Sequence, residues 1–218
     1  MCSSRNPVRI VACVIALGLV FVQAALAADK QPIRFNTADQ AAAKAVTVKA
    51  ADLSPVWKGG VKKPDLTPDA DCAYKRSDLV LTGAAKSEFK MQGASITSES
   101  NVLQTPAMVA AEWHRSFGNS SYMACARKIV MDSDESNVTF VSFKKIPFPK
   151  LTQYSARYRM VADYGDAGSA IRVLVDVVML GRSRTEISLV VTVPYANRAS
   201  ADVAERQLAR LLVSRIAA

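Results

Sequence analysis

The feature that most constrains the fold is a series of strand-like segments in the C-terminal half of the chain. They span residues 138–146, 152–164, 170–180 and 185–193, and short turns separate them. In the last two segments apolar residues occupy every second position, which is the period of a half-buried strand. Strands joined by short turns pair antiparallel, so this order predicts a four-stranded meander and excludes a parallel sheet with alternating helices.

Charged residues occupy alternate positions in these segments. Opposite charges on neighbouring strands stabilise a sheet, so we expect a cross-strand ion lattice that faces water. Its members are Arg157, Arg159, Arg172, Asp176 and Glu186.

A β-hairpin is predicted ahead of the meander. Residues 86–91 and 95–104 flank the loop 92–94, and a three-residue loop containing a glycine is typical of a hairpin. Both segments are polar on one face, which predicts an exposed edge of the sheet.

Helices are predicted before, between and after these strands. Thr37 and Gln40 form a capping-box signature, and Thr105 followed by Pro106 supplies an N-cap with proline at the first helical position. The predicted helices span residues 37 to about 49–51, 106–117, 121–131 and about 200–216. The expected fold class is therefore α+β: an antiparallel sheet, made of a hairpin and a four-stranded meander, with helices packed on one face and a closing C-terminal helix.

One stretch lacks any sustained period. Residues 54–78 are rich in Pro, Gly, Lys and Asp, which predicts an irregular linker on the surface, held at Trp57 and Cys72. We expect one domain over residues 28–218, with an N-terminal arm over 28–78 and a core over 79–218.

The first 27 residues read as a cleavable signal peptide. Arg5 and Arg9 form a basic start, residues 10–22 are apolar, and Ala25-Leu26-Ala27 supplies a small-residue exit. The apolar run is too short for a spanning helix, although an uncleaved anchor is the alternative. We expect a secreted or extracytoplasmic chain that starts at Ala28 and has no transmembrane segment after cleavage.

Two cysteines remain once the leader, with Cys2 and Cys13, is removed. Cys72 and Cys125 in an exported chain predict one disulfide. It would close a loop of about fifty residues and stabilise the fold by roughly 4 kcal/mol. Two buried free thiols are the alternative. Two cysteines and a single histidine without ligand spacing do not predict a zinc site, and we expect no metal.

The charge is positive and uneven. The formal net charge of +9 becomes +7 without the leader, and residues 144–218 carry 12 basic against 6 acidic side chains. A basic half can meet an anionic envelope component, or it can be an ordinary solvated surface. The basic residues are interspersed and no aromatic-basic motif occurs, so we expect no nucleic-acid partner.

A search for catalytic residues finds no motif. His114 is the only histidine, and its place beside Trp113 favours the polar flank of a helix over a general base. No nucleophile elbow, phosphate loop, dinucleotide fingerprint or zinc-protease motif occurs. We therefore expect no cofactor and no recognised catalytic residues.

A basic loop is the one surface feature that we single out. Phe148 lies between two prolines, and Lys144, Lys145 and Lys150 flank it. An apolar tip in a cationic setting suits contact with a membrane surface, an anionic glycan or a protein. The alternative is an ordinary loop with Phe148 tucked under the sheet.

The order of elements over residues 79–216 resembles the Mog1/PsbP-like domains. The segments 51–57 (ADLSPVW), 71–72 (DC) and 83–89 are similar to uncharacterised secreted proteins of actinobacterial type, some with extracellular sensor-like domains. The resemblance implies binding of ligands or partners rather than catalysis. It carries over no site residues, and the single cysteine pair departs from relatives that carry two.

Three functions are compatible with this sequence. The first is a non-catalytic binding module that holds a small apolar or envelope-derived ligand, which predicts a preformed cavity. The second is an interaction protein that docks an acidic partner or envelope surface through its basic half. The third is a hydrolase with an unrecognised site, which predicts titratable groups that converge in a pocket.

Overall fold

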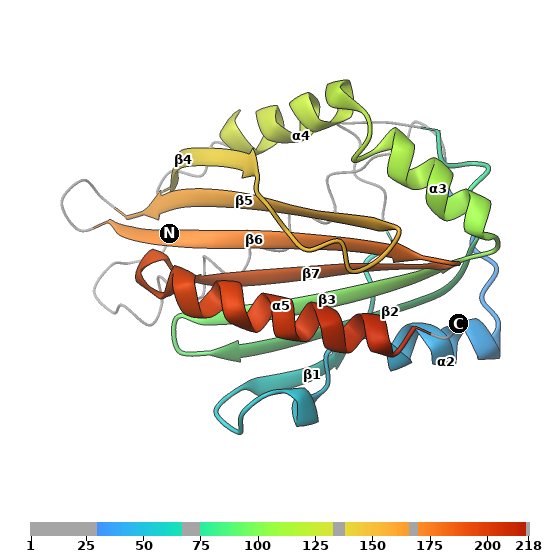
Figure 1. Ribbon diagram of the computed structural model, residues 1–218, viewed down its shortest axis with the longest axis horizontal. Helices are drawn as coiled ribbons and strands as arrows, with labels where there is room; N and C mark the ends of the chain where they lie inside the picture. The colour runs from blue at the N-terminus through green and yellow to red at the C-terminus, as the bar shows by residue number, and fades with distance from the viewer. Residues whose placement is uncertain (1–29, 67–74, 133–137, 166–169, 217–218) are drawn as a thin grey trace.

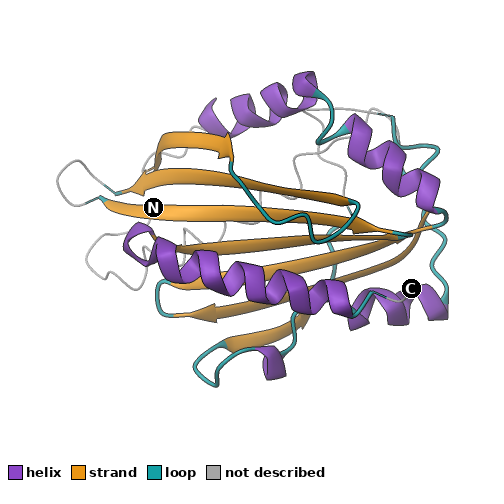
Figure 2. Cartoon of the chain, in the orientation of Figure 1, coloured by secondary structure: helices purple, strands orange, loops and turns teal. Residues whose placement is uncertain are grey.

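A seven-stranded antiparallel sheet organises the chain (Figures 1 and 2). The computed structural model describes residues 30–66, 75–132, 138–165 and 170–216. The strands are β1 (Lys58–Lys62), β2 (Leu81–Met91), β3 (Ala94–Leu103), β4 (Val138–Lys145), β5 (Tyr154–Tyr164), β6 (Ile171–Arg182) and β7 (Thr185–Pro194), in the order β1-β2-β3-β7-β6-β5-β4. The predicted α+β class, with its hairpin, meander and closing helix, is confirmed.

The hairpin and the meander form one sheet because β3 pairs with β7. Ile96 faces Val191 and Ser98 faces Leu189 across this junction. The strand order places the hairpin beside the last strand of the meander, a neighbour far away in the sequence. The hairpin turn is also tighter than predicted, since Met91 pairs directly with Ala94. Gly93 adopts a φ of 74°, which a glycine accepts without strain in such a turn.

The helices pack on both faces of the sheet. They are α2 (Thr37–Ala45), α3 (Pro106–Arg115), α4 (Ser120–Asp132) and α5 (Arg198–Ser214), with short 3₁₀ turns at η1 (Ala50–Asp52) and η2 (Tyr195–Asn197). Figure 1 shows α5 lying along the sheet over β7 and β3, whereas α4 lies beside β4. We expected the helices on one face. Instead, α5 packs against one set of alternating strand residues, whereas α3 and α4 pack against the other set, which points to the opposite face.

The largest core cluster lies under α5. Leu174 and Val178 of β6, with Ile187 and Leu189 of β7, pack against α5 residues such as Leu212. Each of these side chains is completely buried. The alternate residues of the same strands, such as Val175, Val177 and Val190, form a second cluster on the opposite face. The period of two in the sequence therefore separates two cores rather than a core and a solvated face.

The start of α2 differs from the predicted capping box. The N-cap is Asn36, whose side chain accepts a hydrogen bond from the backbone N–H of Asp39. α2 lies directly on β2 at Gly83, where an added Cβ would be 2.3 Å from the carbonyl oxygen of Asp39. For α3 the predicted cap is confirmed, with Thr105 as N-cap and Pro106 opening the helix.

Part of the predicted linker is a strand. β1 pairs with β2, with Gly60 opposite Glu88. Gly59 lies so close to β2 that a Cβ there would be 2.0 Å from the carbonyl oxygen of Glu88. This edge strand is held by backbone pairing at glycines, so it has no alternating apolar pattern to detect.

The predicted signal peptide, residues 1–27, lies outside the described residues. Within the described ranges, no helix combines the length and the apolar character needed to cross a membrane.

Candidate functional site

A cavity of about 140 Å³ lies between the sheet and the helices α3 and α4. Its floor is formed by side chains of β3, β5, β6 and β7, and the helices supply the opposite wall. The helix residues that line it are Glu112, Trp113, Ser116, Phe117, Met123 and Ala126. The binding-module hypothesis predicted a cavity lined by apolar residues from both layers, whereas this cavity also carries charged side chains.

One side of the cavity is aromatic. The ring centroid of Trp113 is 5.0 Å from that of Phe117, and Phe117 is 5.8 Å from Tyr158. Phe143 of β4 stacks on Tyr158 at 5.9 Å. These distances are those of favourable aromatic pairs. The four rings form a continuous wall from α3 to the β4–β5 edge, and Met179 lies beside them in the cavity lining.

The other side of the cavity is polar. Glu99 and Asn101 of β3 pair with Ser188 and Glu186 of β7 in the sheet register. Paired residues point to the same face of a sheet, so these four side chains form a compact polar floor. Glu112 of α3 lies above it, and all five residues line the cavity.

The charges on this floor are only partly balanced. Arg76 Nη2 lies 3.0 Å from Glu112 Oε1, and Lys86 Nζ lies 2.6 Å from Glu99 Oε1. Glu186 instead shares a hydrogen bond with Glu112. Burial first, and then the facing Glu112 carboxylate, raise the pKa of Glu186 well above its usual range, although Arg76 opposes the shift. This shift favours the protonated form of Glu186, which lies beside Glu112 as one of a pair of carboxyl groups.

α3 fixes the segment that carries Arg76. Arg115 binds both carboxylate oxygens of Asp78 at 2.6 and 2.8 Å and donates to the backbone carbonyl of Lys75. The hydrogen bonds from Arg115 lower the pKa of Asp78 to about 2. The anchored residues stand on either side of Arg76, so this pairing positions the guanidinium at the cavity.

The arrangement suits recognition of a small molecule. A ligand body can pack against the aromatic wall, while hydrogen-bonding groups meet the carboxyl pair and the amide of Asn101. Apolar walls with a few converging polar groups are typical of small-molecule sites.

No family model and no curated protein match this chain. Two solved structures resemble it in part. An uncharacterised protein of Mycobacterium smegmatis, the Rv0999 ortholog, is 10% identical over 82% of this chain and 97% of its own, with a TM-score of 0.43. The Ran-binding protein Mog1p of Saccharomyces cerevisiae is 12% identical over 78% of this chain and 82% of its own, with a TM-score of 0.25. The structural neighbours thus include a Mog1/PsbP-like protein and an uncharacterised mycobacterial protein.

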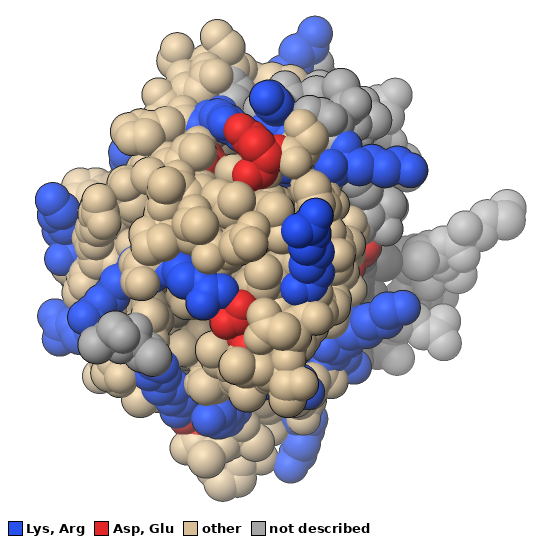
Figure 3. All heavy atoms as spheres, turned by 90° about the vertical axis from the view of Figure 1, so that its right-hand side faces the viewer, with Lys and Arg blue, Asp and Glu red and all other residues tan. Residues whose placement is uncertain are grey.

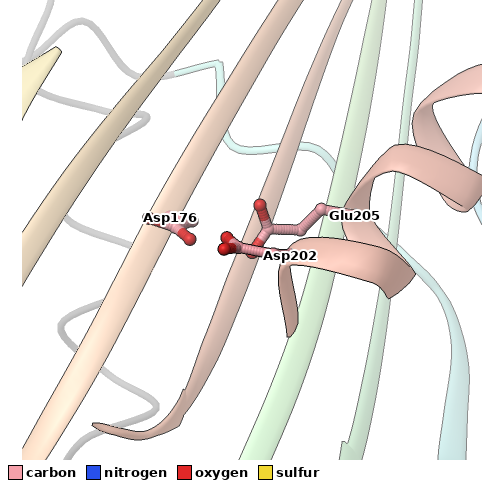
Figure 4. Close-up of side chains that lie close together, drawn as sticks. All are labelled: Asp176, Asp202 and Glu205. Carbon is pink, nitrogen blue, oxygen red and sulfur yellow. The ribbon is translucent and has the colours of Figure 1, made fainter. Parts of the chain in front are cut away.

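A second cluster of titratable groups lies on the other face, under α5. Asp176 of β6 and Asp202 and Glu205 of α5 point toward one another, and their carboxylate oxygens lie within 4.8 Å (Figure 4). Arg157 Nη2 and Arg159 Nη2 each lie 2.6 Å from Asp176 Oδ2, and both arginines also bind Asp202.

The arginines make this cluster an ion-pair network rather than a metal site. They already occupy the positions from which a cation would meet the carboxylates. Burial, followed by the neighbouring Asp176, raises the pKa of Glu205 to about 9. With Glu205 protonated, two aspartates balance two arginines, and no charge is left for an ion to neutralise.

The predicted water-facing lattice is therefore wrong in its main members. Arg157 is only 4% exposed and Asp176 is completely buried, because α5 covers them. Glu186 lies on the opposite face, in the cavity. Of the predicted members, only Arg172 forms a surface ion pair of the expected kind. Its Nε lies 2.7 Å from Asp163 Oδ1.

The basic loop has an apolar side chain that is turned inward. Lys144, Lys145 and Lys150 are exposed, but Phe148 is half-buried and packs against the core cluster under α5. Phe148 therefore lies as in the alternative prediction, in which it packs beneath the sheet and does not form an exposed tip. On the face of the molecule in Figure 3, lysine and arginine side chains are spread out rather than gathered into one patch.

The remaining predicted residues do not meet in the cavity. Cys125 lies on α4, whereas Cys72 falls outside the described residues, so their disulfide stays a prediction. His114 is exposed on α3, and its ring is 6.4 Å from that of Tyr154.

Sequence reasoning missed the polar floor of the cavity. The available signal was the pair of alternating polar residues on β3 and the matching pair on β7, together with Glu112 beside Trp113.

Proposed function

We propose that this chain is an exported, non-catalytic binding module of the cell envelope or extracellular space. It holds a small, largely apolar ligand in the cavity between α3, α4 and the sheet. The observation that carries the proposal is the cavity itself, with its aromatic wall facing a polar floor.

The size of the cavity limits the ligand. A dry cavity of about 150 Å³ accommodates benzene, so a cavity of about 140 Å³ has room for a body of one ring or a short branched chain. Trp113, Phe117 and Tyr158 offer the apolar contact area, and Glu186 and Asn101 offer hydrogen bonds that orient the ligand. Export rests on the predicted leader at residues 1–27.

A hydrolase that uses the carboxyl pair is the second candidate. The raised pKa of Glu186 beside Glu112 is the convergence of titratable groups that such an enzyme needs. However, the two carboxyl groups hydrogen-bond each other, whereas glycosidases keep their pair about 5 Å or more apart. The small cavity also leaves no room for a polymer between them, so binding accounts for the geometry better than hydrolysis.

The proposal is tested by native mass spectrometry of residues 28–218 purified gently from the host. We expect a discrete non-covalent adduct. Ala126→Leu should abolish it, because Ala126 lines the cavity and a leucine fills the space. Ala124→Leu is the matched control, since Ala124 lies on the same helix but is exposed. Absence of any adduct, or an adduct that survives in Ala126→Leu, would contradict the proposal.

A further inference from the structure

We propose that the ligand of this cavity is a small organic cation, with its ammonium group against Glu186 and Glu112 and its apolar body against the aromatic wall. This inference rests on the proposed function, because it names the chemical class that the same cavity takes.

The charges at the cavity support a cation. Three carboxylates line it, those of Glu99, Glu112 and Glu186. Lys86 pairs with Glu99 and Arg76 pairs with Glu112, whereas no cation of the described residues lies within ion-pair distance of Glu186. Among the residues that the structure describes, the cavity therefore has one carboxylate without a paired cation, and an ammonium group would balance its charge.

The aromatic wall favours the same class. The faces of tryptophan, tyrosine and phenylalanine rings attract cations, and a cage of such rings with nearby carboxylates is a common way to recognise ammonium groups. Trp113, Phe117 and Tyr158 form a continuous series at centroid distances of 5.0 and 5.8 Å. They line the same cavity as the carboxyl pair, so one small ligand can reach both.

Other ligand classes fit less well. An anion would meet three carboxylates, and Arg76, the arginine among the described lining residues, is already paired with Glu112. A neutral ligand would leave the surplus carboxylate to be neutralised by a proton. A cation replaces that proton, because its charge favours the ionised form of Glu186.

Proton release follows from the groups that face Glu186. These are Glu112 from α3, Arg76 from the segment before β2, and Glu99 with its partner Lys86 from the neighbouring strands. In the empty cavity the protonated form of Glu186 is favoured, since burial and Glu112 raise its pKa well above the usual range. Binding of an ammonium group near neutral pH should therefore release a proton to the solvent.

The test compares two probes of the same shape. Benzylamine is a cation at neutral pH, and benzyl alcohol is its neutral counterpart. In calorimetric titrations of residues 28–218, we expect benzylamine to bind more tightly by on the order of tenfold. Its binding heat should also change with the ionisation enthalpy of the buffer, as proton release requires. This second measurement needs no variant.

Two substitutions locate the effect. Glu186→Gln should remove both the preference for benzylamine over benzyl alcohol and the buffer dependence of the binding heat. Glu88→Gln is the matched control, because Glu88 lies on the same sheet, is not among the residues that line the cavity, and pairs with Lys90. Equal affinities for the two probes in the unsubstituted protein would overturn the cation inference and leave the binding function standing. Failure of both probes to bind would count against both.

Discussion

Arg157 of β5 and Asp176 of β6 form an ion pair that is buried between the sheet and α5. Arg157 Nη2 lies 2.6 Å from Asp176 Oδ2, and the two side chains are 4% and 0% exposed. Arg157 also reaches Asp202 and Glu205 of α5. One guanidinium thus joins the closing helix to the meander.

Removal of this guanidinium should destabilise the fold strongly. Arg157→Met leaves Asp176 and Asp202 with Arg159 alone, and breaking a buried pair costs about 3–5 kcal/mol. Arg172→Met is the matched control, since Arg172 pairs with Asp163 across the same two strands at the surface. Surface pairs contribute little, so the control should unfold nearly as the unsubstituted protein does. Urea denaturation of both variants measures the difference, and similar losses in both would refute a special role for the buried pair.

Glu205 should make the stability fall as the pH rises. Burial, and then Asp176, raise its pKa to about 9 in the folded protein, above its usual value. The folded state therefore binds the proton more tightly than the unfolded state, and the free energy of unfolding decreases by up to about 1.4 kcal/mol per pH unit between roughly pH 4.5 and 9.

Glu205→Gln removes this titration and keeps a side chain that can donate to Asp176. We expect the variant to be more stable than the unsubstituted protein at pH 8, by about 2–4 kcal/mol, and its stability to vary less with pH. Denaturation curves at several pH values provide the measurement. A variant that is less stable at pH 8 would show that Glu205 is ionised in the folded protein.

The contact of α2 with β2 depends on Gly83. Gly83→Ala places a Cβ 2.3 Å from the backbone oxygen of Asp39, so α2 must move away from the sheet. Overpacking of this kind costs about 1–3 kcal/mol or more. Gly60→Ala is the control, because no atom lies within 4 Å of a Cβ at that position. Thermal unfolding should separate the two variants, and equal midpoints would show that α2 does not approach β2 this closely.

The predicted disulfide has a simple test. If Cys72 pairs with Cys125, the intact mass of residues 28–218 is lower by two hydrogens than that of the reduced chain, and reduction should cost roughly 2–4 kcal/mol of stability. Two alkylated thiols in the unreduced, unfolded protein would overturn the pairing.

Alternation along the strands predicted the meander well, because the period of two shows directly which residues share a face. It could not show what covers each face. Lys86 and Ser98 of the hairpin read as an exposed edge, yet β1 and β7 flank the hairpin, and both residues are buried. Arg157 and Asp176 were predicted to face water for the same reason, because the alternation does not show that α5 covers them.

The cavity could not be predicted from the sequence for a related reason. Glu99 and Glu186 lie far apart in the sequence and meet only because β3 pairs with β7. That pairing closes the sheet between the hairpin and the meander, and no local pattern specifies it. The position of α3 over these residues depends in turn on Val109, which packs into a small cluster with Leu81 and Leu103.

The two tryptophans allow ligand binding in the cavity to be tested within one sample. Trp113 lines the cavity, whereas Trp57 packs against the core under α5. We would titrate ¹⁵N-labelled residues 28–218 with benzylamine and follow the two indole N–H resonances. Binding in the cavity should produce a saturable shift of the Trp113 resonance with little change at Trp57. A shift at Trp57 alone, or no shift at either resonance, would contradict it.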